Sequence, residues 1–544
     1  MKIKTVEKVA LKYIIIGIMS SIALVISSLL YILLAFYLGK IVEASLDLDM
    51  LSFKKGVIIA LGIITFSGVC NYMGQVLRKK FSVKATLLYK QKIIDKILGF
   101  SYTKYNQSHQ SYYLNMMTEE TYVIQEHYFM QFSAIVQNFS QIIFGIMALV
   151  YISWKFTLAV FGLFFLPLLV PVFIGPILSR RRMSVNSIHE SYIVTLKGIL
   201  EGFELIRTYG LLNIIREQFK SANTKLENTR YHFSKVDFLK DILSNSLTAI
   251  SQMGAIAIGV ALIFDGQMTV PILFAAVQII NAIINPIDDL SQRLSWIVGT
   301  KLVREKHERM LSSQNTENIN GTIINNINNI VIENLTFSYE NQLVFDKLSF
   351  RFEKGKKYAI IGESGSGKST LLKLLLGHYG NYEGDILYDD LNQRSIDLSS
   401  LHRNISSIHQ NTFLFEDTLK NNIELYKEHT KSDYDSAIIK SNLMTLNKLV
   451  GETILVDNGS KLSGGEKQRI AIARCLINKS DIILVDEATS SLDSENAYLF
   501  FNSILELNGV LCIVVTHNDN PEILKRFDCV LRVKDYKLEI VNEI

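Results

Sequence analysis

Six long stretches of the chain carry no charged side chain, and they limit the possible fold more than any other feature of the sequence. They cover residues 13–39, 56–77, 132–153, 156–179, 244–264 and 266–287. Each has at least the roughly 20 residues that an α-helix needs to cross the hydrocarbon core of a bilayer. We therefore predict an all-α domain over residues 1–312 that crosses the membrane six times and leaves both termini on the same side.

The positions of lysine and arginine predict which side that is. Residues 78–131 carry eight of them and residues 180–243 carry eleven, whereas the opposite-side connections carry only four: Lys40, Lys54, Lys55 and Lys155. Cytoplasmic connections keep the excess of positive charge. We expect both termini and everything after residue 290 to lie in the cytoplasm, with the two long inner segments continuing the membrane helices below the bilayer.

Polar side chains recur at helical spacing inside three of the six stretches. Such a stripe either binds neighbouring helices or lines a watery path. For residues 266–287 we weigh a substrate cavity and interhelical bonding about equally, and for the other two stretches interhelical bonding has the better case. The candidate cavity residues are Asn71, Gln75, Asn138, Gln141, Gln278, Asn281 and Asn285.

The rest of the chain has the composition of a soluble protein. Residues 313–330 are rich in asparagine and predict a polar linker, and residues 331–544 are long enough for one α/β domain. The mean hydropathy of +0.22 is thus the average of two different halves. A net charge of only +4 gives no reason to expect a nucleic-acid partner.

A glycine-rich loop follows a predicted strand over residues 358–361 and precedes a predicted helix. Backbone N–H groups of such a loop, at the start of a helix, bind phosphate oxygens. The ammonium group of its lysine would pair with the β- and γ-phosphates, and the hydroxyl of Ser369 would bind Mg²⁺. The loop is a P-loop of the Walker A pattern and consists of Gly362, Glu363, Ser364, Gly365, Ser366, Gly367, Lys368, Ser369 and Thr370.

A second apolar strand, over residues 482–485, ends in two acidic residues. The carboxyl ends of strands in an α/β sheet present ligands. We predict that Asp486 holds Mg²⁺ and that Glu487 polarises the attacking water. Two acids after an apolar run are a weak signal alone, and the phosphate-binding loop gives them their weight.

The sequence Leu462-Ser463-Gly464-Gly465-Glu466, followed by a predicted helix, narrows this nucleotide-binding protein further. It resembles the signature of the ATP-binding-cassette (ABC) transporters, usually LSGGQ, and the whole chain resembles a half-size exporter of that family. The resemblance implies further roles: Tyr339 would stack on adenine, Gln410 would sense the γ-phosphate and Mg²⁺, Asp493 would communicate between two sites, and His517 would contact the γ-phosphate. Ser463, Gly464, Gly465 and Glu466 would bind ATP held by a partner chain.

The resemblance implies an ATPase that moves an amphipathic or peptide-like substrate out of the cytoplasm by alternating access, with ATP and Mg²⁺ bound. Its partners would be the bilayer, the exported molecule and a second half-transporter. We expect a homodimer in the plasma membrane of a bacterium, without a leader-peptidase domain; a heterodimer with one weakened site is the alternative. The alternatives are a multidrug or lipid exporter and, in another class, an ATP-gated channel or regulatory membrane protein. Short cross-helices near residues 111–120 and 197–207 would couple the two domains.

Overall fold

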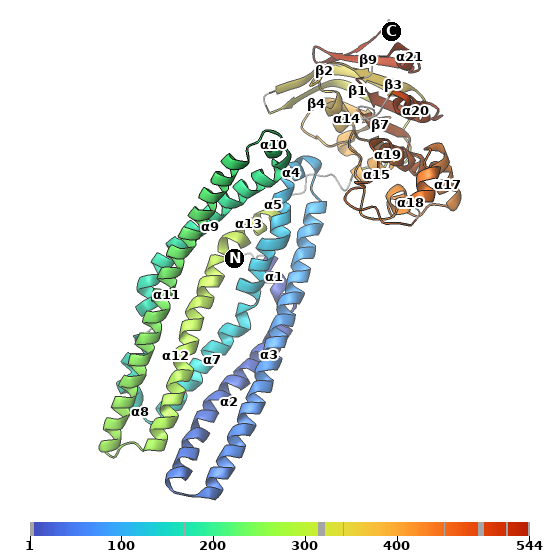
Figure 1. Cartoon of the computed structure of the whole chain (residues 1–544). Coiled ribbons are helices and arrows are strands. Elements are labelled where there is room, and N and C mark those ends of the chain that lie inside the picture. The colour runs from blue at the N-terminus through green and yellow to red at the C-terminus, as the bar shows by residue number, and fades with distance from the viewer. Residues whose placement is uncertain are drawn as a thin grey trace. The chain divides into compact units, whose positions relative to one another are not determined.

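The computed structural model describes residues 5–541 except 167–168, 314–320, 341, 451, 488–493 and 518–519. The chain divides into two compact units (Figure 1). The first contains Met1–Lys96 and Gln110–Ser313, and the second contains Ile97–His109 and Gln314–Ile544. A short piece of the membrane half of the sequence, Ile97–His109, therefore packs with the soluble half.

The first unit is entirely helical. Its helices are α1 (Thr5–Lys12), α2 (Ile14–Leu46), α3 (Met50–Leu98), α5 (Gln110–Asn115), α6 (Thr121–Ile124), α7 (Gln131–Ile152), α8 (Trp154–Phe161), α9 (Leu169–Glu201), α10 (Phe203–Thr208), α11 (Leu212–Phe264), α12 (Val270–Gly299) and α13 (Lys301–Ser312). Two π-helical turns, η1 (Met116–Glu120) and η2 (Gln125–Phe129), and one 3₁₀ turn, η3 (Gly162–Phe165), interrupt them. The predicted all-α fold class is confirmed.

Five helical segments among the described residues are long and apolar enough to cross a membrane, and they cover five of the six predicted spans. They are Ile14–Leu46, Met50–Leu98, Gln110–Ile152, Leu212–Phe264 and Val270–Ser312. The predicted fourth span, residues 156–179, falls on α8, η3 and the start of α9, and residues 167–168 within it lie outside the described residues. That span stays a prediction.

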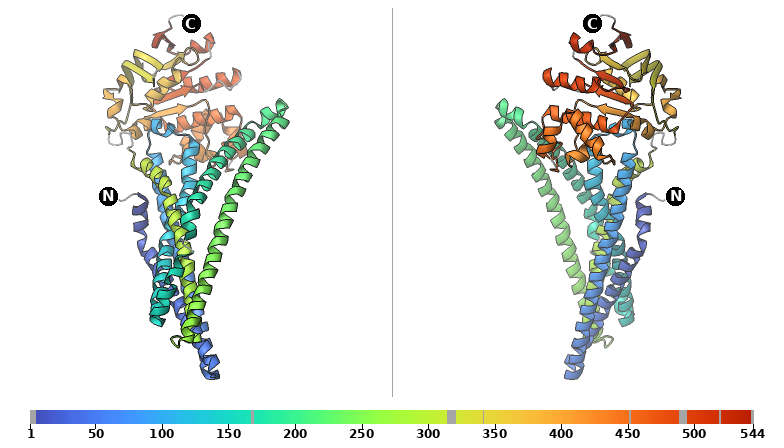
Figure 2. Two further views of the ribbon diagram at one scale, coloured as in Figure 1. Left: turned by 90° about the vertical axis from the view of Figure 1, so that its left-hand side faces the viewer. Right: turned by 90° about the vertical axis from the view of Figure 1, so that its right-hand side faces the viewer.

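Helix packing in the first unit separates two groups. Helices α2, α7 and α12 pack on one another around a core that includes Ile279 and Ile283, while α9 and α11 pack along each other. Figure 2 shows the α9–α11 pair diverging from the other helices toward the end that carries α10. Small residues allow the close contacts: a Cβ on Gly145 would lie 2.5 Å from Ile283 Cγ1.

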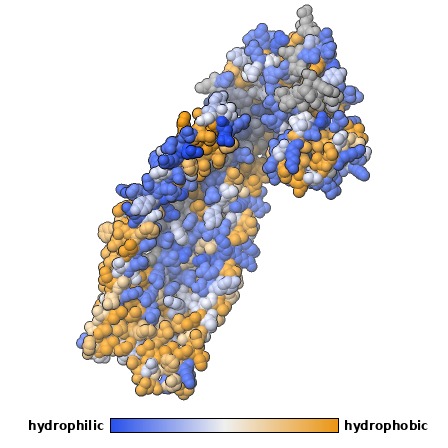
Figure 3. Space-filling model, in the orientation of Figure 1, coloured by the Kyte–Doolittle hydropathy of each residue, from blue (hydrophilic) through white to orange (hydrophobic). Residues whose placement is uncertain are grey.

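The surface of the first unit changes character along the helices. Apolar side chains gather at the end that holds the α2–α3 and α11–α12 turns, and polar side chains cover much of the opposite part of α9 and α11 (Figure 3). Helices α3 and α11 have 49 and 53 residues, about twice what a bilayer requires. This distribution fits membrane helices that extend beyond the bilayer on one side.

The second unit contains two sheets. An antiparallel sheet has the order β2-β1-β4-β5, and a largely parallel six-stranded sheet has the order β10-β9-β3-β8-β7-β6. The strands are β1 (Asn329–Tyr339), β2 (Gln342–Glu353), β3 (Lys357–Ile361), β4 (Glu383–Tyr388), β5 (Leu391–Asn392), β6 (Ile405–Ile408), β7 (Ile482–Asp486), β8 (Leu511–Val515), β9 (Cys529–Lys534) and β10 (Lys537–Ile540). The predicted α/β class is confirmed, and β1 begins two residues before the predicted boundary at residue 331.

Helices surround these sheets within the second unit. They are α4 (Tyr102–Asn106), α14 (Lys368–Leu375), α15 (Leu398–Asn404), α16 (Leu419–Glu424), α17 (Lys431–Lys440), α18 (Met444–Val450), α19 (Gly464–Asn478), α20 (Ser494–Leu505) and α21 (Pro521–Leu524), with a 3₁₀ turn η4 (Gln393–Ser395). Strand β3 pairs in parallel with β8, and β8 pairs in parallel with β7. Their carboxyl ends therefore lie side by side at one sheet edge, where an α/β fold presents its ligand site.

Helix α4 corrects the predicted position of the first cross-helix. We expected it near residues 111–120, but those residues form α5 and η1 in the first unit. The chain turns earlier: α3 ends at Leu98, and the Ser101 hydroxyl caps α4 by accepting a bond of 3.3 Å from the Lys104 backbone N–H. The second predicted cross-helix, near residues 197–207, overlaps α10.

Candidate nucleotide-binding site

The phosphate-binding loop joins the end of β3 to the start of α14. Its three glycines all have positive φ angles: Gly362 (151°), Gly365 (82°) and Gly367 (102°). At Gly367, a Cβ atom would lie 2.6 Å from Val344 Cγ1, so both conformation and space require glycine there. The loop also holds the buried hydroxyl of Ser366, which has no hydrogen-bond partner among the described residues. A buried polar atom of this kind suits a ligand with its own donors and acceptors.

Lys368 and Ser369 lie directly behind the loop, in the first turn of α14. The Lys368 ammonium group donates to the backbone carbonyls of Gly362 (3.0 Å) and Glu363 (2.9 Å). Burial lowers the pKa of Lys368, although the carboxylates of Glu487 and Asp486 oppose this shift. The cation is thus already inside the loop, within reach of a bound phosphate.

Ser369 and Asp486 bring two oxygen atoms together at the end of β7. The Ser369 hydroxyl donates to the Asp486 carboxylate over 2.7 Å. Among the described residues, no group of three or more His, Cys, Asp or Glu side chains could hold a metal. One hydroxyl and one carboxylate nevertheless fit Mg²⁺, which binds through few protein ligands and completes its shell with water and substrate phosphates.

Glu487 and His517 face each other from neighbouring strands. Glu487 follows β7 with φ of 49°, and its backbone N–H donates to the Val515 carbonyl over 3.1 Å. Its carboxylate lies 2.7 Å from Nε2 of His517, which follows β8. A non-glycine residue in this left-handed conformation costs energy and is often found at functional sites. The pairing of β7 with β8 therefore brings together two residues that are 30 positions apart.

Tyr339 lies at the end of β1 with a partly exposed ring. Its hydroxyl lies 3.2 Å from Thr370 Oγ1, in the first turn of α14, and donates to the Tyr379 hydroxyl over 3.2 Å. The ring also packs edge-on against Phe337, at 5.0 Å between centroids. Tyr339 is thus connected to the phosphate-binding helix, and the residue is 38% exposed.

The signature residues form the start of α19. Ser463 is the N-cap, and its hydroxyl accepts a bond of 3.3 Å from the Glu466 backbone N–H. The Glu466 carboxylate accepts bonds from the Ser463 backbone N–H (2.8 Å) and hydroxyl (2.9 Å). This reciprocal arrangement is a capping box. It places a carboxylate at a helix start that would otherwise attract an external anion.

Two further predicted nucleotide residues are Gln410 and Asp493. Gln410 is exposed and follows β6, on the other side of β7 from the loop. Asp493 lies outside the described residues.

The predicted cavity residues make two kinds of contact. Asn138 on α7 is buried and donates to the Asp289 carboxylate on α12 over 3.0 Å, and Asn281 on α12 accepts a bond from Gln252 on α11. These are interhelical bonds, the alternative that the sequence left open. Asn71 and Gln75 bond within α3, over 3.3 Å. Gln141 and Gln278 are half-buried and Asn285 is exposed.

Sequence reasoning missed the charged residues that continue the polar face of α12. Asp289 accepts a bond of 2.7 Å from Arg293 Nε, and Arg293 Nη1 donates to Gln131 on α7 over 2.8 Å. Nearby on α3, Arg78 is half-buried, and its Nε has no partner in the described part of the chain. The helical spacing from Asn285 to Asp289 to Arg293 was a usable signal.

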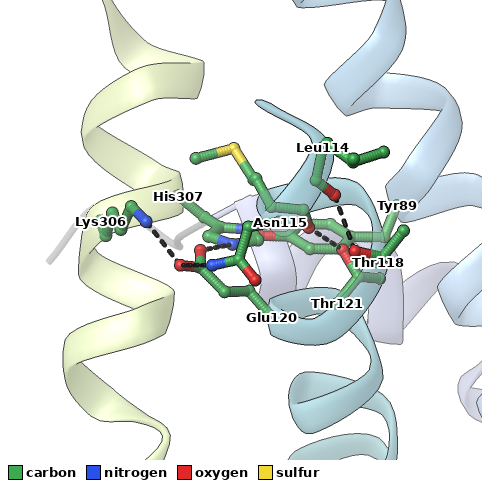
Figure 4. Close-up of polar contacts among 9 residues, drawn as sticks. Tyr89, Leu114, Asn115, Thr118, Glu120, Thr121, Lys306 and His307 are labelled. Carbon is green, nitrogen blue, oxygen red and sulfur yellow. Dashed lines mark hydrogen bonds and ion pairs between the residues drawn. The ribbon is translucent and has the colours of Figure 1, made fainter. Parts of the chain in front are cut away.

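A second missed cluster joins three segments of the first unit and is drawn in Figure 4. His307 on α13 is fully buried, with Nδ1 2.9 Å from the Tyr89 hydroxyl on α3 and Nε2 2.9 Å from the Glu120 carboxylate in η1. Lys306 donates to the other Glu120 oxygen over 2.5 Å. The cluster fixes α13, which leads out of the first unit, against α3 and η1.

Comparison with known proteins agrees with this architecture. Residues 17–287 match the ABC transporter transmembrane region, and residues 345–490 match the ABC transporter domain. The structure resembles that of a bacterial Atm1-family ABC exporter with ATP bound, with a TM-score of 0.79, 20% identity, and coverage of 98% of this chain and 94% of that one. At this identity the likeness shows the fold.

Curated relatives are ABC transporters as well. The microcin-J25 export ATP-binding/permease protein McjD of Escherichia coli is 29% identical over 385 residues, 68% of this chain and 65% of that protein. The ATP-dependent lipid A-core flippase of Haemophilus ducreyi is 24% identical over 522 residues, 92% of this chain and 88% of that protein. The lactococcin-G-processing and transport protein LagD of Lactococcus lactis is 28% identical over 341 residues, 61% of this chain and 48% of that protein.

The helical domain and the nucleotide-binding fold in one chain define an ATP-driven, multi-pass membrane transporter. The chain belongs to the ABC transporter family, as an exporter that carries one transmembrane region and one ATP-binding domain.

Proposed function

We propose that two copies of this chain form an exporter that moves an amphipathic, peptide-like molecule out of the cytoplasm. The observation that supports ATP hydrolysis is that five predicted site residues lie at the carboxyl ends of neighbouring strands. They are Lys368, Ser369, Asp486, Glu487 and His517. The names of two relatives specify a microcin and lactococcin G, which supports a peptide substrate, and the name of a third specifies lipid A-core, which keeps a lipid as the second candidate.

Each residue of the nucleotide site has a distinct role in this proposal. The loop N–H groups and Lys368 bind the β- and γ-phosphates of ATP, and Tyr339 stacks on the adenine. Ser369 and Asp486, with Gln410, hold Mg²⁺, which when bound neutralises charge on the phosphates. Glu487 orients the attacking water, and His517, whose Nε2 lies 2.7 Å from the Glu487 carboxylate, contacts the γ-phosphate. We assign Asp493 to communication between the two ATP sites.

The signature of one chain completes the ATP site of the other. Ser463, Gly464 and Gly465 offer N–H groups at the start of α19, and one chain supplies one loop and one signature. Because Glu487, His517 and a full signature occur in the same chain, two identical chains enclose two working sites. We therefore propose a homodimer.

Exposed apolar surfaces on both units fit the same dimer. At the α10 turn, Phe203 and Leu205 are 64% and 56% exposed. On the second unit, Phe413, Phe415 and Tyr426 are exposed and pack edge-on in a row. We propose that α10 of one chain docks on this aromatic row of its partner. Closure of the cassettes around ATP would then move the membrane helices.

The orientation follows from the charge asymmetry. With nineteen lysines and arginines on one side and four on the other, we place both termini and the ATP-binding domain in the cytoplasm of a bacterial cell.

The test is ATP hydrolysis and transport by the purified protein in proteoliposomes. We expect Glu487→Gln to lower the ATPase rate at least 100-fold and to stop substrate accumulation while ATP binding remains. Glu383→Gln, an exposed position on β4, is the matched control and should retain both activities. Stimulation of the ATPase by added peptides but not by lipid A-type lipids would support the peptide substrate. Passive flux without hydrolysis would refute the pump and support an ATP-gated channel.

A further inference from the structure

Helix α4 packs against the segment that follows the phosphate-binding helix, within the second unit. The Tyr102 ring stacks on the His378 ring, with centroids 4.1 Å apart and planes at 11°. It also meets Tyr379 edge-on at 6.2 Å and 86°. His378 and Tyr379 come three and four residues after the end of α14 at Leu375. One residue of α4 thus touches the direct continuation of the helix that begins at Lys368.

Tyr379 in turn contacts the residue proposed to hold adenine. Its ring meets the Tyr339 ring edge-on at 5.5 Å and 86°, and its hydroxyl accepts the bond from the Tyr339 hydroxyl. Phe337 packs on both rings, at 5.0 Å from Tyr339 and 5.2 Å from Tyr379. All these centroid distances fall within the range of favourable aromatic pairs. The orientation of the Tyr339 ring is therefore fixed largely by Tyr379 and Phe337.

We propose that Tyr102 and Tyr379 are positioning residues for ATP, which act through Tyr339: α4 orients Tyr379, and Tyr379 orients the ring that stacks on adenine. A displacement of α4 therefore changes the affinity for the base of the nucleotide, in addition to any effect on the phosphates. This inference rests on the proposed ATP-binding role of Tyr339. It adds a defined route by which the membrane half of the sequence reaches the nucleotide.

Two substitutions separate the ring contacts from the hydroxyl bond. Tyr379→Phe keeps the edge-on packing and removes the bond to Tyr339, so we expect the KM for ATP to rise about two- to threefold. Tyr379→Leu removes both, and we expect a rise of about five- to tenfold. In both variants kcat should change less than twofold, because the phosphate end of the site is untouched. A fall in kcat at unchanged KM would refute a positioning role.

The decisive experiment is a double-mutant cycle in the full-length protein in nanodiscs. We expect Tyr102→Ala to raise the KM for ATP about three- to fivefold, with Lys104→Ala, whose ammonium group bonds to Gln107 at the C-cap of the same helix, as the control. In a Tyr339→Ala background, Tyr102→Ala should have no further effect on KM, because the ring through which it acts is gone. An equal effect in both backgrounds would overturn the proposal.

A base-free probe separates this inference from the proposed function. Inhibition of the ATPase by inorganic triphosphate should be the same in wild type and in Tyr102→Ala, because that probe does not contact Tyr339. If Tyr102→Ala weakens triphosphate inhibition as much as ATP binding, then α4 acts on the phosphate loop and the route through Tyr379 is wrong. Absence of ATPase activity in the wild type would instead refute the proposed function itself. Tyr102→Phe, which keeps the ring, should match the wild type.

Discussion

The polar cluster around His307 and the polar loop around Lys368 differ in how their groups are paired. In the cluster, both His307 nitrogens and both Glu120 oxygens are bonded to other side chains. In the loop, the Ser366 hydroxyl is buried without a partner among the described residues, and Lys368 bonds only to backbone carbonyls. Buried polar groups cost free energy unless they are paired. Groups that pair with one another stabilise the fold, and groups left open are available to a ligand.

Among the substitutions that test this difference, we expect the largest effect from one that breaks the polar cluster around His307. We expect Glu120→Ala to lower the free energy of unfolding by about 3 kcal/mol, because it leaves His307 and Lys306 without their carboxylate. Thermal unfolding of the purified protein in detergent measures this. The KM for ATP should not change. Glu119→Ala, at the exposed neighbouring position, is the control and should cost less than about 0.5 kcal/mol. An altered KM with unchanged stability would show that the cluster serves the nucleotide site.

The contrast also explains what the sequence could predict. The phosphate-binding loop is one run of consecutive residues, and the strands predicted over residues 358–361 and 482–485 appear as β3 and β7 within one residue. Local spacing alone defines such a site. The apolar stretches likewise predicted the helices because length and lack of charge are local properties.

Contacts between distant segments could not be predicted in this way. Tyr102 meets Tyr379 across 277 positions, and both are aromatic residues without a motif. From the sequence, Asn138 could line a cavity or bond to another helix. Its hydrogen bond to Asp289 on α12, which only the structure shows, identifies the interhelical bond. The first cross-helix was misplaced because residues 111–120 continue the helical path through α5 and η1. Pairing across a fold depends on topology, which residue types alone do not specify.

A smaller effect on stability is expected from His378, a histidine of the second unit that has a buried, unpaired ring nitrogen. Nδ1 of His378 has no partner among the described residues. Burial, with the positive charges of His402, His409 and Lys373, lowers the pKa of His378 to about 4 from its ordinary value of 6.5. The unfolded chain therefore takes up this proton near pH 6.5, while the folded chain takes it up only near pH 4.

Neutral His378 therefore makes its full contribution to the free energy of unfolding above pH 6.5. This contribution is lost as the pH falls toward 4, and the loss is about 2 kcal/mol at pH 5. His378→Phe keeps a ring on Tyr102 and removes both the titration and the unpaired nitrogen, so thermal unfolding of this variant should depend less on pH between 7 and 5. His189→Phe, at an exposed position, should follow the wild type. An equal acid loss in wild type and His378→Phe would show that His378 is not the group responsible.

The smallest effect is expected at the signature, where Ser463 and Glu466 already bond to each other. The Glu466 carboxylate occupies the Ser463 N–H and hydroxyl, donors that the signature would offer to the ATP of a partner chain. Glu466→Gln preserves a capping box, because an amide oxygen also accepts these bonds, but removes the negative charge. We expect the KM for ATP to fall about two- to fivefold, in line with about 0.3–1 kcal/mol for one charge at a helix start. Glu466→Ala instead loses the cap, at a cost of about 1 kcal/mol in stability. If Glu466→Gln leaves KM unchanged, the carboxylate moves away before ATP arrives and the capping box serves only the unbound chain.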